Sequence, residues 1–167
     1  NTFVLAVSAI IIAMILGLIF GVISALKKNT WIDRSIQVFS TLGMSVPSFF
    51  SAILFAWLFG FVLHKYTNLE MTGSLYELDD FGETVNIKWK NLILPAIVLG
   101  IRPLAVIIQL MRNSLLEVMN QDYIRTARAK GLSEFQIIKN HAIKNALNPV
   151  VTAISGWFAS MLAGAVF

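Results

Sequence analysis

Four continuous apolar runs dominate the sequence, at residues 3–26, 35–63, 92–111 and 149–167. Each is close to or above the roughly 20 residues that a helix needs to cross a hydrocarbon core about 30 Å thick. Lipid requires every backbone polar group to pair internally, and these runs do not alternate as barrel strands do. The pattern therefore predicts an all-α, polytopic membrane helical bundle.

The composition supports a membrane environment and argues against metal or thiol chemistry. Of 167 residues, 57% are hydrophobic and 13% are charged, whereas soluble domains carry about 25% charge. The sequence has no cysteine and two isolated histidines, a set that is poorly suited to zinc. We expect no metal, no cofactor and no catalytic residue. The chain begins at Asn1 and ends inside an apolar run, so we also expect it to be a piece of a longer protein.

The charges of the connections predict the orientation. The connections at 27–34 and 112–148 together hold nine Lys and Arg residues, whereas the connection at 64–91 holds three lysines and five acids. Basic residues concentrate on the cytoplasmic side of membrane proteins. We therefore expect 27–34 and 112–148 to lie in the cytoplasm and 64–91 to form an outer loop.

Small residues and a proline shape the first two predicted spans. A stripe at helical steps of three and four lets helix backbones approach closely, and it comprises Ala6, Ala9, Ala13, Gly17, Gly21 and Ser24. In the second span Pro47 removes a backbone donor, which predicts a kink near the middle of the helix.

Polar residues inside the spans are candidates for a translocation pathway. Gln37, Thr41 and Ser45 share one helical face with Ser48, and either line a passage or hydrogen-bond to a neighbouring helix. Arg102 lies ten residues past Leu92, so about 15 Å into the bilayer, where an unpartnered arginine costs at least ~2.5 kcal/mol. Gln109 lies on the same helical face as Arg102. Arg102 either faces a wet pathway or extends to an interface.

The connection at 112–148 is predicted to be an amphipathic helix-turn-helix. The first helix places Leu116, Met119, Tyr123 and Ala127 on one face. Gly131 ends that helix, and Ser133 with Gln136 forms a capping box that begins a second one. The second helix places Phe135, Ile138 and Ala142 on one side and Lys139 on another.

Three uses of this segment follow from its chemistry alone. Its apolar face fits a groove on a cytoplasmic protein while its basic rim sets the orientation. A basic helix-turn-helix is also the general form of a DNA-binding motif, and an amphipathic element binds anionic lipid. Both ends are tied to membrane spans, which argues against nucleic acid because a recognition helix needs free access to the major groove.

The same segment carries a family resemblance. DYIRTARAKGLSE at 122–134, followed by HAIKNALNPV at 141–150, resembles the cytoplasmic signature of binding-protein-dependent ABC transporter permeases. Only Ala127 and Gly131 match the general family pattern. The rest of the segment resembles the sequence typical of the oligopeptide/dipeptide branch, which includes nickel carriers. KKNTWIDR at 27–34, SVPSF at 45–49 and RNSLLEV at 112–118 extend the resemblance over most of the chain, but not over the outer loop.

The resemblance implies a function and a set of partners. Residues 1–167 would be part of a single transmembrane domain of the type I ABC importer kind, with four of its six spans. It would form half of a pathway for oligopeptides or dipeptides, or for a nickel chelate, across the bacterial cell membrane. The implied partners are two cytoplasmic ATP-binding subunits, a second permease subunit in a heterodimer and an extracytoplasmic solute-binding protein.

The resemblance also assigns the coupling helix, which docks on the ATPase. The residues it implies for ATPase docking are Tyr123, Arg125, Thr126, Ala127, Arg128, Lys130 and Gly131. No G-x-x-x-x-G-K-[ST] phosphate-binding loop occurs in the sequence, so ATP hydrolysis is expected on a partner and the chain is not expected to be an enzyme. The alternative function is a secondary transporter or channel that is not driven by ATP.

Overall fold

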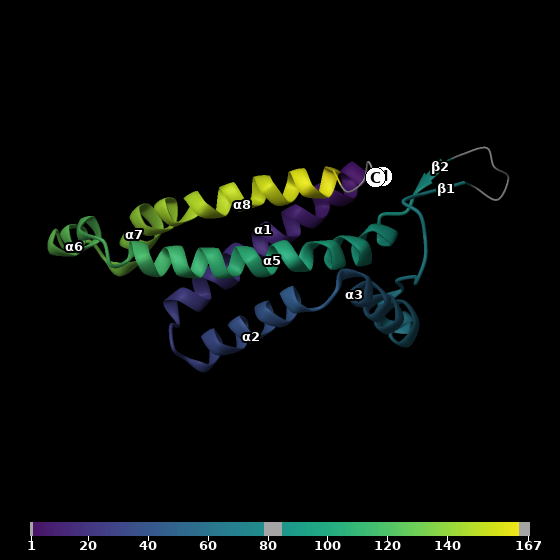
Figure 1. Cartoon of the computed structure of the whole chain (residues 1–167), viewed down its shortest axis with the longest axis horizontal. Coiled ribbons are helices and arrows are strands. Elements are labelled where there is room, and N and C mark those ends of the chain that lie inside the picture. The colour runs from purple at the N-terminus through teal and green to yellow at the C-terminus, as the bar shows by residue number, and fades with distance from the viewer. Residues whose placement is uncertain (1, 79–84, 164–167) are drawn as a thin grey trace.

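The computed structural model describes residues 2–78 and 85–163, and it is almost entirely helical (Figure 1). Its elements in chain order are α1 (Thr2–Leu26), α2 (Trp31–Ser45), α3 (Ser48–Phe55), the π-helix η1 (Ala56–Val62), α4 (His64–Thr67), β1 (Tyr76–Leu78), β2 (Val85–Ile87), α5 (Lys90–Val118), α6 (Asp122–Ala129), α7 (Glu134–Ile137), the π-helix η2 (Ile138–Ala142) and α8 (Ile143–Ala163). This agrees with the predicted all-α membrane bundle.

Helix α5 is the central element, because α1, α2, α3 and α8 all pack against it. Its closest partner is α1, and the small-residue stripe on α1 is buried in that contact. A Cβ atom added at Gly17 would lie 2.6 Å from Cγ2 of Ile107, and one added at Gly21 would lie 2.7 Å from Cβ of Met111. The predicted close approach of helix backbones is therefore confirmed.

The second predicted span is broken rather than kinked. Helix α2 ends at Ser45, α3 begins at Ser48, and the axes of α2 and of α3 with η1 differ by 108°. Pro47 lies at this break, as the sequence predicts, but the change of direction is far larger than a kink. Within the described residues, α1, α5 and the helical stretch Glu134–Ala163 are each long and apolar enough to cross a membrane, and the bent pair makes up to four spans.

Among the described residues, strands occur only in the segment between α4 and α5. After α4 the chain forms β1 and β2, which pair antiparallel with Tyr76 opposite Ile87 and Leu78 opposite Val85. Beyond this hairpin α5 begins at Lys90 and continues to Val118, seven residues past the predicted end of the third span.

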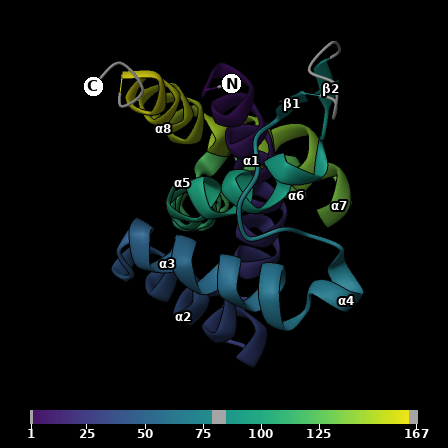
Figure 2. The ribbon, with the colours of Figure 1, turned by 90° about the vertical axis from the view of Figure 1, so that its right-hand side faces the viewer.

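The two basic connections lie at the same end of the bundle. Figure 1 shows α6, α7 and the turn between α1 and α2 at one end of the long axis, with β1 and β2 at the other. Seen along that axis in Figure 2, α3 and α4 run across the bundle below α5. The arrangement agrees with the charge pattern, which places 27–34 and 112–148 on one side of the membrane.

Candidate functional site: the α6–α7 segment and the Asp33 cluster

A short turn separates α6 from α5. Helix α5 ends at Val118, residues 119–121 form a turn, and α6 begins at Asp122. The predicted common face of Leu116, Met119, Tyr123 and Ala127 is therefore wrong, because Leu116 lies in α5, Met119 in the turn, and Tyr123 and Ala127 in α6.

The inner side of α6 and α7 belongs to the same core as the membrane helices. Ile124 and Ile137 are fully buried, and Ala127 is 6% exposed. They share one hydrophobic cluster with Leu115 of α5 and with Ala142 in η2. Ala127 thus allows α6 to pack closely on its own chain, and the tip is fixed to α5 by apolar contacts.

Gly131 makes the turn between α6 and α7. Its φ is +80°, a left-handed conformation that side chains rarely adopt. A Cβ atom there would meet nothing within 4 Å, so the backbone conformation rather than lack of space favours glycine. The predicted capping box is confirmed: the Gln136 N–H donates to Oγ of Ser133 at 3.3 Å, and the Ser133 N–H donates to Oε1 of Gln136 at 3.0 Å.

The predicted apolar side of the second helix is wrong at one residue. Phe135 is predicted to share one side of the helix with Ile138 and Ala142, but Phe135 is 72% exposed whereas Ala142 is fully buried, and Ile137 is buried with Ala142. The π-helical turn at η2 has a wider repeat than an α-helix, so a face extrapolated at 3.6 residues per turn loses its phase there. The ammonium of Lys139 lies 5.9 Å from the centre of the Phe135 ring.

The outer surface of α6, α7 and their turn combines cations with exposed aromatic and apolar side chains. We call this surface the α6–α7 tip. Of the predicted docking residues, Tyr123, Arg125, Thr126, Arg128, Lys130 and Gly131 are exposed on it, and Ala127 is not. Sequence reasoning missed two exposed apolar residues of the tip, Leu132 and Phe135.

Two polar contacts hold the tip in shape. Nε of Arg128 donates to Oε1 of Glu134 at 2.7 Å across the turn. This hydrogen bond lowers the pKa of the Glu134 carboxyl and raises the pKa of Arg128. Nδ2 of Asn145 on α8 donates to Oη of Tyr123 at 3.0 Å, which ties α6 to the last membrane helix.

The structure does not gather the predicted pathway residues into one cluster. Gln37 donates from Nε2 to Oγ of Ser24 on α1 at 3.1 Å, while the hydroxyls of Thr41 and Ser45 donate to carbonyls one turn back in α2. Arg102 is exposed and Gln109 is half-buried on α5. Among the described residues, neither of these two side chains forms a hydrogen bond or an ion pair with α2.

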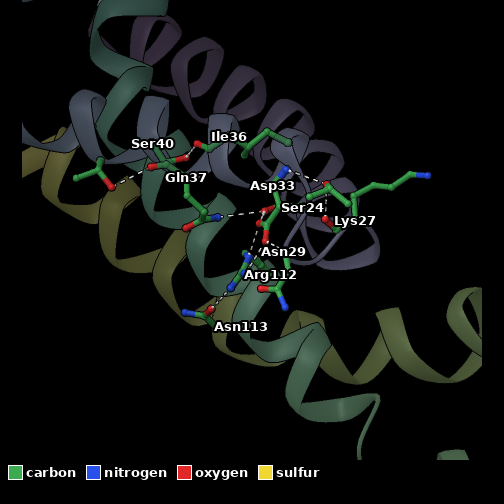
Figure 3. Close-up of polar contacts among 11 residues, drawn as sticks. Ser24, Lys27, Asn29, Asp33, Ile36, Gln37, Ser40, Arg112 and Asn113 are labelled. Carbon is green, nitrogen blue, oxygen red and sulfur yellow. Dashed lines mark hydrogen bonds and ion pairs between the residues drawn. The ribbon is translucent and has the colours of Figure 1, made fainter.

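A second polar arrangement, which sequence reasoning did not identify, lies behind the tip (Figure 3). Asp33, in the first turn of α2, is 3% exposed. Its carboxylate accepts hydrogen bonds from both Nε and Nη2 of Arg112, at 2.7 and 2.8 Å. It also accepts from Oγ of Ser24 at 2.5 Å and from the backbone N–H of Asn29 at 2.9 Å. We call these residues the Asp33 cluster, which joins the C-terminal end of α1, the N-terminal end of α2 and the C-terminal part of α5.

Comparison with known proteins identifies one family. Residues 17–167 match the family described as "Binding-protein-dependent transport system inner membrane component". The chain is 39% identical over 163 residues to the dipeptide transport system permease protein DppB of Bacillus subtilis, covering 98% of this chain and 48% of that protein.

Two further relatives give the same picture. A putative peptide permease protein of Brucella suis is 39% identical over 99% of this chain and 50% of its own length. The di/tripeptide transport system permease protein DppB of Pseudomonas aeruginosa is 37% identical over 99% of this chain and 53% of its own length. The chain thus spans about half the length of the curated relatives that it matches.

Proposed function

Because the chain belongs to the family of binding-protein-dependent transport system inner membrane components, we propose that it forms part of the membrane pathway of an ABC importer for peptides. The names of its relatives, which are dipeptide, di/tripeptide and peptide permeases, support a peptide solute over a nickel chelate. In this proposal residues 1–167 are part of one transmembrane domain, which pairs with a second permease subunit.

The observation that carries the proposal is the α6–α7 tip. Phe135 and Leu132 expose apolar surface on it, and Arg125, Arg128 and Lys130 are exposed on the same segment. Protein–protein contacts usually combine exposed apolar side chains with a polar or charged rim. We assign the tip to a groove on a cytoplasmic ATP-binding subunit, with one such subunit for each permease.

The buried side of α6 and α7 explains how a partner's motion would reach the membrane. Ile124 and Ile137 pack into the cluster that contains Leu115 on α5, and α5 is one helix from Lys90 to Val118. Packed cores transmit displacement because they are nearly incompressible. ATP-driven closure of the two partner subunits would therefore move the tip and α5 together, opening the pathway alternately to each side.

ATP hydrolysis belongs to the partner in this proposal, and the chain itself acts as a pathway and a lever. Its pathway residues are Gln37, Thr41, Ser45, Arg102 and Gln109. Arg102 is exposed midway along α5, about 18 Å from Lys90 at 1.5 Å per residue. A guanidinium at that depth fits the carboxylate of a passing peptide. A solute-binding protein would deliver the peptide at the outer side, where loop 64–91 lies.

Two variants of the tip test the proposal. Phe135→Ala removes the most exposed apolar side chain of the tip, and Gly131→Trp places a bulky side chain on a left-handed turn. Tyr66→Ala is the matched control, because Tyr66 is an 82% exposed aromatic residue on α4 at the opposite end. The measurements are co-purification of ATP-binding subunits from membranes, and peptide uptake with and without ATP at a clamped membrane potential.

The proposal predicts that both tip variants lose the ATP-binding subunits and ATP-dependent uptake, while Tyr66→Ala keeps both. Uptake that persists without ATP would instead assign the chain to a secondary transporter or channel. Unchanged co-purification with both tip variants would show that the tip is not the docking surface.

A further inference from the structure

We propose that the Asp33 cluster is a joint that makes α2 move as one body with α5, so that displacement of the α6–α7 tip reaches the face of α2 that carries Gln37. The inference rests on the proposed function, in which the tip is displaced by a partner. Asp33 and Arg112 are positioning residues in it, and neither contacts the solute.

The geometry of the ion pair gives the joint its stiffness. Nε and Nη2 of Arg112 donate to the two different carboxylate oxygens of Asp33, at 2.7 and 2.8 Å. A two-point contact between a planar guanidinium and a planar carboxylate fixes orientation as well as distance. The remaining acceptor positions of Asp33 are filled by Ser24 on α1 and by the backbone of Asn29.

The position of Arg112 connects this pair to the tip. Arg112 lies on the same unbroken helix as Val118, about 9 Å before its end at 1.5 Å per residue. Leu115, one turn further on, is fully buried in the cluster that includes Ile124 of α6. A displacement of α6 is therefore carried by α5 directly to the guanidinium.

Beside the Asp33 cluster, α2 is also tied to α1 by the hydrogen bond from Nε2 of Gln37 to Oγ of Ser24. A cavity of about 270 Å³ lies between α1, α2 and α5, lined by Phe20, Ile36, Phe39, Ser40, Gly43, Ile101, Leu104, Ala105 and Ile108. Atoms that face a cavity lose their dispersion contacts. Apolar packing between α2 and α5 is thus incomplete beside the cluster. Gly43 and Ile101, two of the lining residues, are nevertheless close to each other, because a Cβ added at Gly43 would lie 3.0 Å from Cγ2 of Ile101.

An ion pair is a better joint here than an apolar contact would be. Replacing a buried ion pair by apolar residues is often neutral or stabilising, so such pairs are weak evidence for a role in stability alone. At this position the ion pair fixes the orientation of α2 relative to α5, because only one placement of α2 lets Arg112 donate to both carboxylate oxygens of Asp33.

An engineered disulfide measures whether α2 follows α5. A Cβ at Gly43 would lie 3.9 Å from Cβ of Ala105, which is within the 3.5–4.5 Å found in disulfides. The double variant Gly43→Cys/Ala105→Cys is prepared in membrane vesicles, where residues 1–167 contain no other cysteine, and the rate of disulfide formation is followed. Into this background we place Asp33→Asn, Arg112→Lys, or the control Arg34→Gln, since Arg34 is an exposed neighbour.

We expect Asp33→Asn and Arg112→Lys to slow disulfide formation by about tenfold or more, because each leaves a buried polar group without its matched partner. Arg34→Gln leaves the rate unchanged. Equal rates in all three would overturn the proposal. If Asp33→Asn does not reach the membrane, Ser24→Ala, which removes one hydroxyl, replaces it and is expected to slow the reaction to a smaller extent.

A second readout separates coupling from mere packing. In the background without engineered cysteines, Arg112→Lys is expected to keep the ATP-binding subunits bound and ATP hydrolysed, but to lower the peptide taken up per ATP. An unchanged ratio would show that the cluster holds α2 without transmitting motion, and would also overturn the proposal. Failure of the proposed function is a different result, because the unmodified protein would then show no ATP-dependent uptake, while the disulfide rate still reports on the joint.

Discussion

The contact between α1 and α5 gives the sharpest prediction about stability. Alanine at Gly17 would place its Cβ 2.6 Å from Cγ2 and 2.9 Å from Cβ of Ile107. Alanine at Gly21 would place its Cβ 2.7 Å from Cβ of Met111 and 3.0 Å from the carbonyl oxygen of Ile108. Real Cβ contacts are almost never so short, so the two helices must separate to accommodate the methyl groups.

The magnitude follows from two opposing effects. Overpacking costs about 1–3 kcal/mol for each site, or roughly 2–6 kcal/mol for Gly17→Ala with Gly21→Ala. Alanine is a better helix former than glycine by about 1 kcal/mol at each site, which offsets about 2 kcal/mol of that cost. The net loss is about 0–4 kcal/mol, and its central value of about 2 kcal/mol corresponds to a fall of about 4–8 °C in the thermal midpoint for a chain of this size.

The assay is thermal unfolding of the detergent-solubilised protein, followed by size-exclusion chromatography of the fraction that remains folded. Gly156→Ala in α8 is the control, because a Cβ there meets nothing within 4 Å. Its midpoint is expected to stay the same or rise slightly. Adding Ile107→Ala to Gly17→Ala should recover about 1 kcal/mol relative to the sum of the single effects. A double glycine variant as stable as Gly156→Ala would refute the close packing of α1 on α5.

Three further predictions concern single contacts. Tyr123→Phe removes the hydrogen bond from Asn145 and should speed amide hydrogen exchange in α6 without changing exchange in α5. The hydrogen bond from Arg128 lowers the pKa of Glu134, so this ion pair stabilises the tip above the ordinary carboxyl pKa and is lost as the pH falls below about 4. Amide hydrogen exchange in the tip should therefore rise at acid pH, and Arg128→Ala should abolish that pH dependence. Arg102→Gln should lower uptake of peptides with a free carboxylate relative to amidated ones, and equal loss of both would assign Arg102 a structural role.

The sequence predicted the features that depend on helical repeat and local chemistry. The stripe that includes Gly17 and Gly21 was predictable because steps of three and four define one helix face. The capping box at Ser133 and the turn at Gly131 were predictable because capping involves residues close together in the chain. The break at Pro47 was located, but its 108° angle was not, because the direction of the following helix depends on tertiary contacts.

Other features depend on pairings that a local pattern does not contain. Asp33 and Arg112 are 79 residues apart, so their contact could not be read from spacing. The available signal was an acid in a basic connection and an arginine at the end of an apolar run. The exposure of Phe135 was missed because the π-helical turn at η2 changes the helical phase, and no residue in Ile138–Ala142 marks that change in the sequence.

The continuity of α5 restricts how this protein can vary in length. One residue inserted between Arg112 and Val118 would rotate everything beyond it by about 100° and shift it by about 1.5 Å, which would turn Leu115 or Ile124 away from their partners. Insertions of seven residues would nearly restore the phase but would lengthen the helix by about 10 Å. Homologous proteins are therefore expected to differ in sequence along this stretch far more readily than in the number of residues it contains.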